Sequence, residues 1–146
     1  MNIYFICTGN TCRSPMAEAI LKQKNLKNVK VHSAGVFANG SGRMSTNARE
    51  VLQWNNIEEN HQSSPIEEQK LMEADLILTM TISHRNAVLQ AYPALADKTF
   101  TLKEYVGDTS SYDVSDPYGG NVEVYAQTFT ELQRLIDALQ LKILED

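Results

Sequence analysis

The sequence predicts an α/β protein built as a single domain, residues 1–146, with a four-stranded parallel sheet and helices on both faces of that sheet. Short apolar runs of strand length alternate with longer segments in which apolar residues recur at helical spacing. Such alternation is typical of strand–helix–strand units in a parallel sheet. The length suits one domain, which usually has about 100 to 150 residues, and we find no internal repeat or linker.

The first predicted strand is the apolar run Ile3–Ile6, which suits a strand that is buried on both faces of the sheet. Three further runs are predicted strands: 29–33, 75–80 and 98–102. In open sheets of this class, ligands bind beyond the carboxyl ends of the strands, near the point where the strand order reverses. The turn that follows the first strand is therefore the first place to look for a functional site.

The first predicted helix has Ser14 as its N-cap and Pro15 at its first position, and it ends near residue 24. A second helix covers 47–54, where we interpret Trp54 as a core residue. The pattern Ser64-Pro65-Ile66-Glu67 is typical of a capping box and predicts a helix that ends near residue 73. The remaining predicted helices are 83–90 and an amphipathic segment of about 122–142.

Composition and charge exclude several classes of protein. The chain is 42% hydrophobic and 21% charged, as in ordinary soluble globular proteins, and it has a net charge of -5. A general nucleic-acid binder carries a basic surplus, so we expect no nucleic-acid partner. No apolar run reaches the roughly 18 to 20 residues that span a bilayer, so we expect no membrane segment. The two cysteines form no secreted disulfide framework, which predicts a cytoplasmic protein with reduced thiols.

The turn after the first strand has the sequence CTGNTCRSP, residues 7–15. The start of a helix presents unpaired N–H groups and partial positive charge, and both bind anions. Gly9 and Asn10 tolerate backbone conformations that turn successive N–H groups inward. Arg13 adds a guanidinium fork that fits phosphate oxygens. A nucleotide-binding P-loop would need a lysine that this turn lacks, so we predict an oxyanion cradle of another kind.

Cys7 stands at the start of this turn. A thiol beside a helix N-terminus and an arginine is expected to have a pKa below the usual value of about 8.5, which would make it a thiolate nucleophile. Cysteine is also a common small core residue, but its place between a strand end and a Ser-Pro helix start favours the nucleophile.

The long polar segment 107–120 offers three carboxylates as a proton donor for a leaving group: Asp108, Asp113 and Asp116. Pro117 slightly favours Asp116, because it restricts the backbone before it.

The pattern Cys-x5-Arg-Ser-Pro, together with Asp116-Pro117, resembles the low-molecular-weight protein tyrosine phosphatase family over nearly the whole chain. The full loop sequence is most similar to the bacterial protein arginine phosphatase branch. The resemblance implies a protein phosphatase that needs no metal or other cofactor, works through a phosphocysteine intermediate and has Asp116 as its general acid. Its partners would be phosphorylated protein substrates, and family members are mostly monomers. The three histidines show no metal-ligand spacing.

The resemblance also assigns supporting residues. Ser14 would donate its hydroxyl to the sulfur of Cys7, Asn10 and His61 would brace the loop, and Tyr118 would line the substrate slot. Many family members have a second aromatic residue after this one, whereas this chain has Gly119. The loop residues that would surround the phosphoryl group are Thr8, Gly9, Asn10, Thr11 and Cys12.

Thr11 bears on the choice of substrate, because many family members have a bulky aliphatic residue at this position. A threonine hydroxyl can bond a polar guanidinium, which favours phosphoarginine, whereas an aliphatic residue would pack against the phenyl ring of phosphotyrosine.

Cys12 leaves two interpretations open: a redox partner that forms a disulfide with Cys7, or a small buried residue behind the loop.

Three rival functions are less favoured by the sequence. An arsenate reductase would need further cysteines to resolve its intermediate, and this chain has none beyond Cys12. A non-catalytic phosphate-binding module would need neither Cys7 nor Asp116. A thiol–disulfide oxidoreductase favours two residues between its cysteines, whereas four separate them here.

Overall fold

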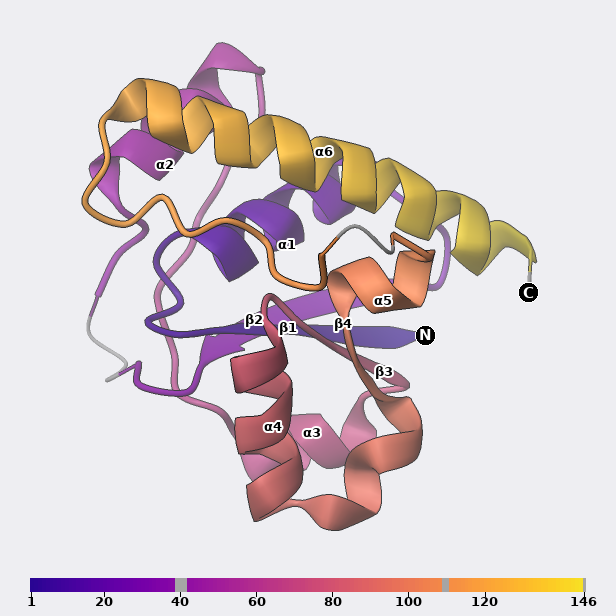
Figure 1. Cartoon of the computed structure of the whole chain (residues 1–146). Coiled ribbons are helices and arrows are strands. Elements are labelled where there is room, and N and C mark those ends of the chain that lie inside the picture. Colours follow the sequence, from indigo (N-terminus) through magenta and orange to yellow (C-terminus); the bar gives the residue numbers. More distant parts are fainter. Residues whose placement is uncertain (39–41, 109–110, 146) are drawn as a thin grey trace.

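The computed structural model describes residues 1–38, 42–108 and 111–145. Its centre is a four-stranded parallel sheet in the order β2-β1-β3-β4 (Figure 1). The strands are β1 (Asn2–Cys7), β2 (Lys30–Gly35), β3 (Leu76–Thr79) and β4 (Thr99–Thr101). The predicted fold class is therefore confirmed, and the predicted strands are present with shifts of one or two residues at their ends. Residues 109 and 110 of the predicted loop 107–120 lie outside the described residues.

Helices cover both faces of the sheet (Figure 1). One face carries α1 (Arg13–Gln23), α2 (Thr46–Trp54), the short α5 (Leu102–Val106) and the long α6 (Val122–Glu145). The other face carries α3 (Glu68–Glu73), α4 (Ile82–Ala91) and the 3₁₀ helix η1 (Pro93–Lys98). No helix in the described part of the chain is long and apolar enough to cross a membrane.

The side chains of β1 divide the hydrophobic core into two layers. Ile3, Phe5 and Cys7 belong to the cluster under α1, α2 and α6, whereas Tyr4 and Ile6 belong to the cluster under α3 and α4. This follows from the period of two along a strand, which sends successive side chains to opposite faces. Strand β2 pairs with one edge of β1 and the following strand β3 pairs with the other, so the strand order reverses at β1. The loop that follows β1 therefore lies where ligands bind in open sheets of this class.

The start of the first helix differs from the prediction. α1 begins at Arg13 with Cys12 as its N-cap residue, and no side chain caps it. Ser14 lies inside the first turn, where its hydroxyl contacts Cys7 Sγ and accepts a hydrogen bond from Asn10. The prediction of Ser14 as an N-cap was wrong, because this hydroxyl is used inside the loop.

The helix predicted to start at Ser64 also begins later, at Glu68. The Ser64 N–H donates to Asn10 Oδ1 and its hydroxyl donates to the carbonyl of Ser33, while its own carbonyl accepts from the N–H of Gly35. These contacts hold the segment beside β2 in an extended course. The capping-box prediction was wrong because tertiary hydrogen bonds take the groups that would have started a helix.

Trp54 was predicted to be a core residue, and this was wrong. It ends α2 with 56% of its surface exposed, whereas Val51 of the same helix is buried. The indole borders a shallow groove between α2 and α6 whose apolar wall includes Phe129. Helical spacing places Trp54 on the same face of α2 as Val51, but the last turn of this helix lies beyond the edge of the core.

Candidate active site

The loop between β1 and α1 is pressed against the end of β2. The N–H groups of Val36 and Phe37 donate to the carbonyls of Cys7 and Thr8, both over 2.9 Å. At Gly35 the approach is so close that a Cβ atom would lie 2.4 Å from the carbonyl oxygen of Thr8. A glycine is therefore required here. Gly35 was not among the predicted site residues, because only the packing of β2 against the loop reveals the requirement.

Asn10 is the buried centre of the loop. Its φ of 57° is left-handed, a conformation that asparagine tolerates better than most residues. Its amide nitrogen donates to the hydroxyls of Ser14 (2.8 Å) and Ser33 (2.9 Å), and its amide oxygen accepts from the N–H of Ser64 (2.9 Å). Three of its hydrogen-bonding positions are thus used, and the side chain ties the loop to α1, β2 and the segment before α3.

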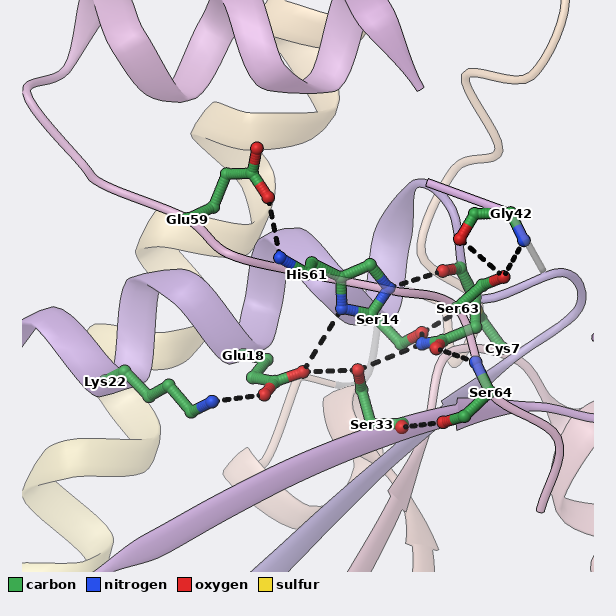
Figure 2. A network of polar contacts seen from close by, with 11 residues as sticks. Cys7, Ser14, Glu18, Lys22, Ser33, Gly42, Glu59, His61, Ser63 and Ser64 are labelled. Atoms are coloured by element: carbon green, nitrogen blue, oxygen red, sulfur yellow. Dashed lines mark hydrogen bonds and ion pairs between the residues drawn. The ribbon is translucent and has the colours of Figure 1, made fainter. Parts of the chain in front are cut away.

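His61 contacts the loop from a distant part of the sequence (Figure 2). Its Nε2–H donates to the carbonyl of Asn10 over 2.7 Å, and its Nδ1 lies 3.8 Å from a carboxylate oxygen of Glu18. Glu18 also accepts from the hydroxyl of Ser33 and from the ammonium of Lys22. The structure therefore brings His61 to the loop, where the resemblance expected it. Two residues that were not predicted, Glu18 and Ser33, join His61 and Asn10 into one network through their contacts.

Cys7 lies at the floor of the loop, with its Sγ 2.7 Å from the hydroxyl of Ser14. Burial raises the pKa of the Cys7 thiol, while hydrogen bonds from Ser14 and Asn10 and the charge of Arg13 act in the opposite direction. The expected lowering of this pKa was wrong, because the sequence could not show how completely the sulfur is enclosed. The groups that favour a thiolate are present, but in this geometry they do not outweigh burial.

Arg13 and Asp116 face each other across the site. The Arg13 guanidinium is buried, donates to the carbonyl of Val114 over 3.0 Å and lies 3.5 Å from the Asp116 carboxylate. Asp116 is half-exposed, and its other oxygen accepts from the N–H of Tyr118. Asp113 accepts from the N–H of Ile82 at the start of α4, and Asp108 pairs with Arg134. Of the three carboxylates, Asp116 is the one that the structure places against the anion-binding arginine.

The remaining predicted residues differ in their surroundings. Thr11 is half-buried, and its carbonyl accepts from the N–H of Ser45. Cys12 is buried with its sulfur 3.3 Å from the hydroxyl of Tyr125, and both cysteines are free thiols, so the disulfide with Cys7 stays one of the two hypotheses for Cys12. Tyr118 is 81% exposed. Thr8 is exposed, and Gly9 is partly buried.

His84 is a further residue at the site that the sequence analysis did not select. It is buried in the first turn of α4, with its Nε2 2.8 Å from the hydroxyl of Thr8. Burial and the nearby charge of Arg13 lower the pKa of His84 from 6.5 to about 4. The ring is therefore neutral near pH 7 and connects the beginning of the loop to the helix after β3.

This burial predicts a specific pH dependence of stability. Between about pH 6.5 and pH 4 the His84 ring binds a proton in the unfolded chain but not in the folded chain, so acid favours unfolding. We expect His84 to lower the free energy of unfolding by about 2 to 3 kcal/mol between pH 7 and pH 4.5. Urea unfolding of the wild type and His84→Gln at both values measures this, because glutamine does not titrate. Equal losses in the two proteins would contradict the prediction.

Comparison with known proteins places this geometry in a family. The chain matches the model of the low molecular weight phosphotyrosine protein phosphatase family over residues 2–146. It is 46% identical to a protein-arginine-phosphatase of Bacillus subtilis (strain 168), in an alignment that covers 100% of this chain and 99% of the relative.

Two solved structures agree with this match. One is the YwlE arginine phosphatase from Geobacillus stearothermophilus, with a TM-score of 0.95 and 44% identity over 99% of this chain and 93% of that one. The other is a YwlE arginine phosphatase mutant with a phosphorylated active-site serine, with a TM-score of 0.94 and 45% identity over 100% of this chain and 97% of that one. Since both the sequence and the fold match over essentially the full length, the chain belongs to the low-molecular-weight protein tyrosine phosphatase family.

Proposed function

We propose that this protein is a cysteine-based protein phosphatase that hydrolyses phosphoarginine through a phosphocysteine intermediate. The observation that carries the proposal is that one loop at the start of α1 holds the buried Cys7, whose sulfur contacts Ser14, and Arg13, which is ion-paired with Asp116. The loop offers an anion site, the thiol a nucleophile and the carboxylate a proton donor. These are the parts that a two-step phosphoryl transfer requires.

In the first step, the Cys7 thiolate attacks phosphorus in line with the bond to the leaving group. The N–H groups of the loop and the Arg13 fork hold the three non-bridging oxygens, so catalysis rests on positioning and electrostatic stabilisation. Because burial raises the pKa of Cys7, the thiolate depends on the groups that oppose this effect. Ser14, 2.7 Å from the sulfur, stabilises the thiolate during attack and again when sulfur leaves in the second step.

Asp116 handles the protons in both steps. It first donates a proton to the leaving atom, which for phosphoarginine is a guanidino nitrogen that departs poorly without one. The same carboxylate, now ionised, then activates a water molecule that hydrolyses the phosphocysteine and restores the thiol. The half-exposed position of Asp116 beside Arg13 suits both tasks, because the carboxylate borders the anion site and is open to solvent.

Thr11 and the curated relatives favour phosphoarginine as the substrate. The relative from B. subtilis is named a protein-arginine-phosphatase, and Thr11 places a small side chain with a hydroxyl in the loop, where it can bond a guanidinium. Phosphotyrosine is the alternative substrate, favoured by the description of the family as a whole. We further propose that the enzyme acts as a monomer in the cytoplasm, in keeping with its two reduced cysteines.

The proposal is tested by phosphate release from two peptides of the same sequence, one with phosphoarginine and one with phosphotyrosine, with Cys7→Ser as the blank. We expect release that depends on Cys7 and a higher kcat/KM for phosphoarginine. A preference for phosphotyrosine would keep the mechanism and change the substrate. If neither peptide released phosphate in a Cys7-dependent way, the enzymatic function itself would be wrong.

Thr11→Ile tests the origin of the substrate preference. Isoleucine removes the hydroxyl that can bond the guanidinium and adds an aliphatic group that packs against a phenyl ring. We expect the ratio of kcat/KM for phosphoarginine over phosphotyrosine to fall by about tenfold, the effect of one hydrogen bond to a charged group. Thr11→Ser, which keeps the hydroxyl, is the matched control and should hold the ratio within about twofold of the wild type. An unchanged ratio in Thr11→Ile would rule out Thr11 as the selector.

A further inference from the structure

We propose that the ion pair between the buried Lys103 and the partly buried Glu131 positions the general acid, because the Glu131 carboxylate also binds Ser115, the residue that precedes Asp116. Lys103 belongs to α5 and Glu131 to α6, so both residues lie far from Asp116 in the sequence. They act on the reaction through the loop and touch no substrate, which makes them positioning residues. This inference rests on the proposed role of Asp116 as the proton donor.

The two oxygens of Glu131 have separate partners. One oxygen lies 2.9 Å from the ammonium of Lys103, whose side chain is only 6% exposed. The other accepts two hydrogen bonds from Ser115, one from its N–H and one from its hydroxyl, both over 3.1 Å. A pair that served only to join α5 to α6 would use the first oxygen alone. The second oxygen instead takes both donors of the residue next to Asp116.

Val114, the residue before Ser115, fixes the same segment through other partners. Its side chain is buried in the core, its N–H donates to the carbonyl of Met80 over 2.8 Å, and its carbonyl accepts from Arg13. After Asp116, Pro117 restricts the backbone further. Asp116 therefore follows two consecutive residues whose backbone groups are bonded, and its distance of 3.5 Å from Arg13 depends on both anchors.

The charge of Lys103 makes this arrangement possible. A lysine is almost never fully buried without a partner, and Glu131 supplies that partner. Burial acts to raise the pKa of Glu131, but the hydrogen bonds and charge of Lys103 and the bonds from Ser115 outweigh it and lower the pKa. The carboxylate is thus ionised near pH 7 and only accepts hydrogen bonds, which is what the ammonium and the two Ser115 donors require.

Loss of this anchor should affect the steps that need a proton from Asp116 and spare those that do not. A leaving group with a low pKa departs without protonation, whereas one with a high pKa needs the acid. A small displacement of a catalytic group lowers the rate steeply. If Glu131 positions Asp116, its replacement will make kcat/KM depend more strongly on the pKa of the leaving group, as we also expect for replacement of Asp116 itself.

The test measures kcat/KM for p-nitrophenyl phosphate, which has a good leaving group, and for phenyl phosphate, which has a poor one. For Glu131→Gln, which keeps the shape of the side chain, we expect a fall on the order of tenfold with phenyl phosphate and less than about twofold with p-nitrophenyl phosphate. The matched control is Glu104→Gln. Glu104 has a similar exposure of 21% and is paired with Arg85, and its contacts with Arg85 and Thr101 lie outside the loop of Asp116. We expect it to leave both values near the wild type.

Two further variants separate positioning from a general loss of structure. In the Asp116→Asn background, Glu131→Gln should have no added effect on phenyl phosphate, because the group that it positions is gone. Ser115→Ala removes the contacts of this hydroxyl with Glu131 and Thr128 without leaving a lysine unpaired, and it should give the same selective loss if Glu131→Gln does not fold. Equal losses with both substrates, or additive losses in the double variant, would overturn the inference. If Asp116→Asn itself lacked the leaving-group effect, the proposed acid would be wrong instead.

Discussion

Cys7→Ser is expected to lower kcat by at least about 10⁴-fold and to accumulate a phosphorylated enzyme. Removal of a nucleophile costs this much in enzymes that work through a covalent intermediate. The serine oxygen can still attack phosphorus slowly in the intact cradle, but a serine alkoxide is a much poorer leaving group than a thiolate, so the phosphoserine ester is not hydrolysed and accumulates. A solved relative carries a phosphorylated active-site serine in a mutant form, in agreement with this expectation. Intact mass spectrometry after incubation with the phosphoarginine peptide would detect the added phosphoryl group.

Cys12→Ser is the matched control for this experiment. Cys12 is also a buried cysteine of the same loop, but its sulfur contacts Tyr125 behind the loop, whereas that of Cys7 contacts Ser14. We expect Cys12→Ser to keep kcat within a few-fold of the wild type and to gain no phosphoryl group. If Cys7→Ser retained turnover, or if the phosphoryl group were found on another residue, the assignment of Cys7 as the nucleophile would have to be abandoned.

Arg13→Lys is expected to lower kcat/KM by about 10³-fold although the positive charge is kept. A planar guanidinium holds two phosphate oxygens at once, whereas an ammonium is a point charge on a flexible stem. An arginine that stabilises a transferring phosphoryl group contributes about 10³ to 10⁵ in rate. Lysine also lacks the planar fork that here reaches both the carbonyl of Val114 and the carboxylate of Asp116. Steady-state kinetics with the phosphoarginine peptide would measure the loss.

Arg85→Lys provides the comparison for this variant. Arg85 lies on α4 and is ion-paired with Glu104 of α5, a contact that does not involve the loop between β1 and α1. We therefore expect its replacement to change kcat/KM by less than about twofold, as for a partly exposed ion pair outside the site. The thermal unfolding midpoints of both variants should be recorded. Activity of Arg13→Lys within tenfold of the wild type would show that charge alone suffices and that the fork is not used.

Much of the fold could be predicted from local patterns, and the errors have physical causes. The run Ile3–Ile6 indicated a fully buried strand, and it forms β1, which lies between β2 and β3 in the sheet. The short elements η1 and α5 lack a clear hydrophobic period and were not predicted. The helix starts at Ser14 and Ser64 were misplaced because both serines bond partners that are distant in the sequence. A capping pattern in the sequence cannot show that the serine forms hydrogen bonds with distant residues instead of capping the helix.

Part of the site was readable for a local reason: the nucleophile, the arginine and the helix start lie within residues 7–15, so their spacing alone indicated an oxyanion cradle. The resemblance already indicated Asp116 among the three carboxylates, and the structure adds its contact with Arg13, across about a hundred residues of chain. Other residues act through contacts between elements, and nothing in the sequence around them indicates a role at the site: Glu18, Gly35, His84, Lys103 and Glu131. The pKa of Cys7 is the sharpest case: local charges predicted a lower value, but it is raised by enclosure from the surrounding fold. Desolvation depends on every neighbour in space, and only the tertiary structure brings those neighbours together.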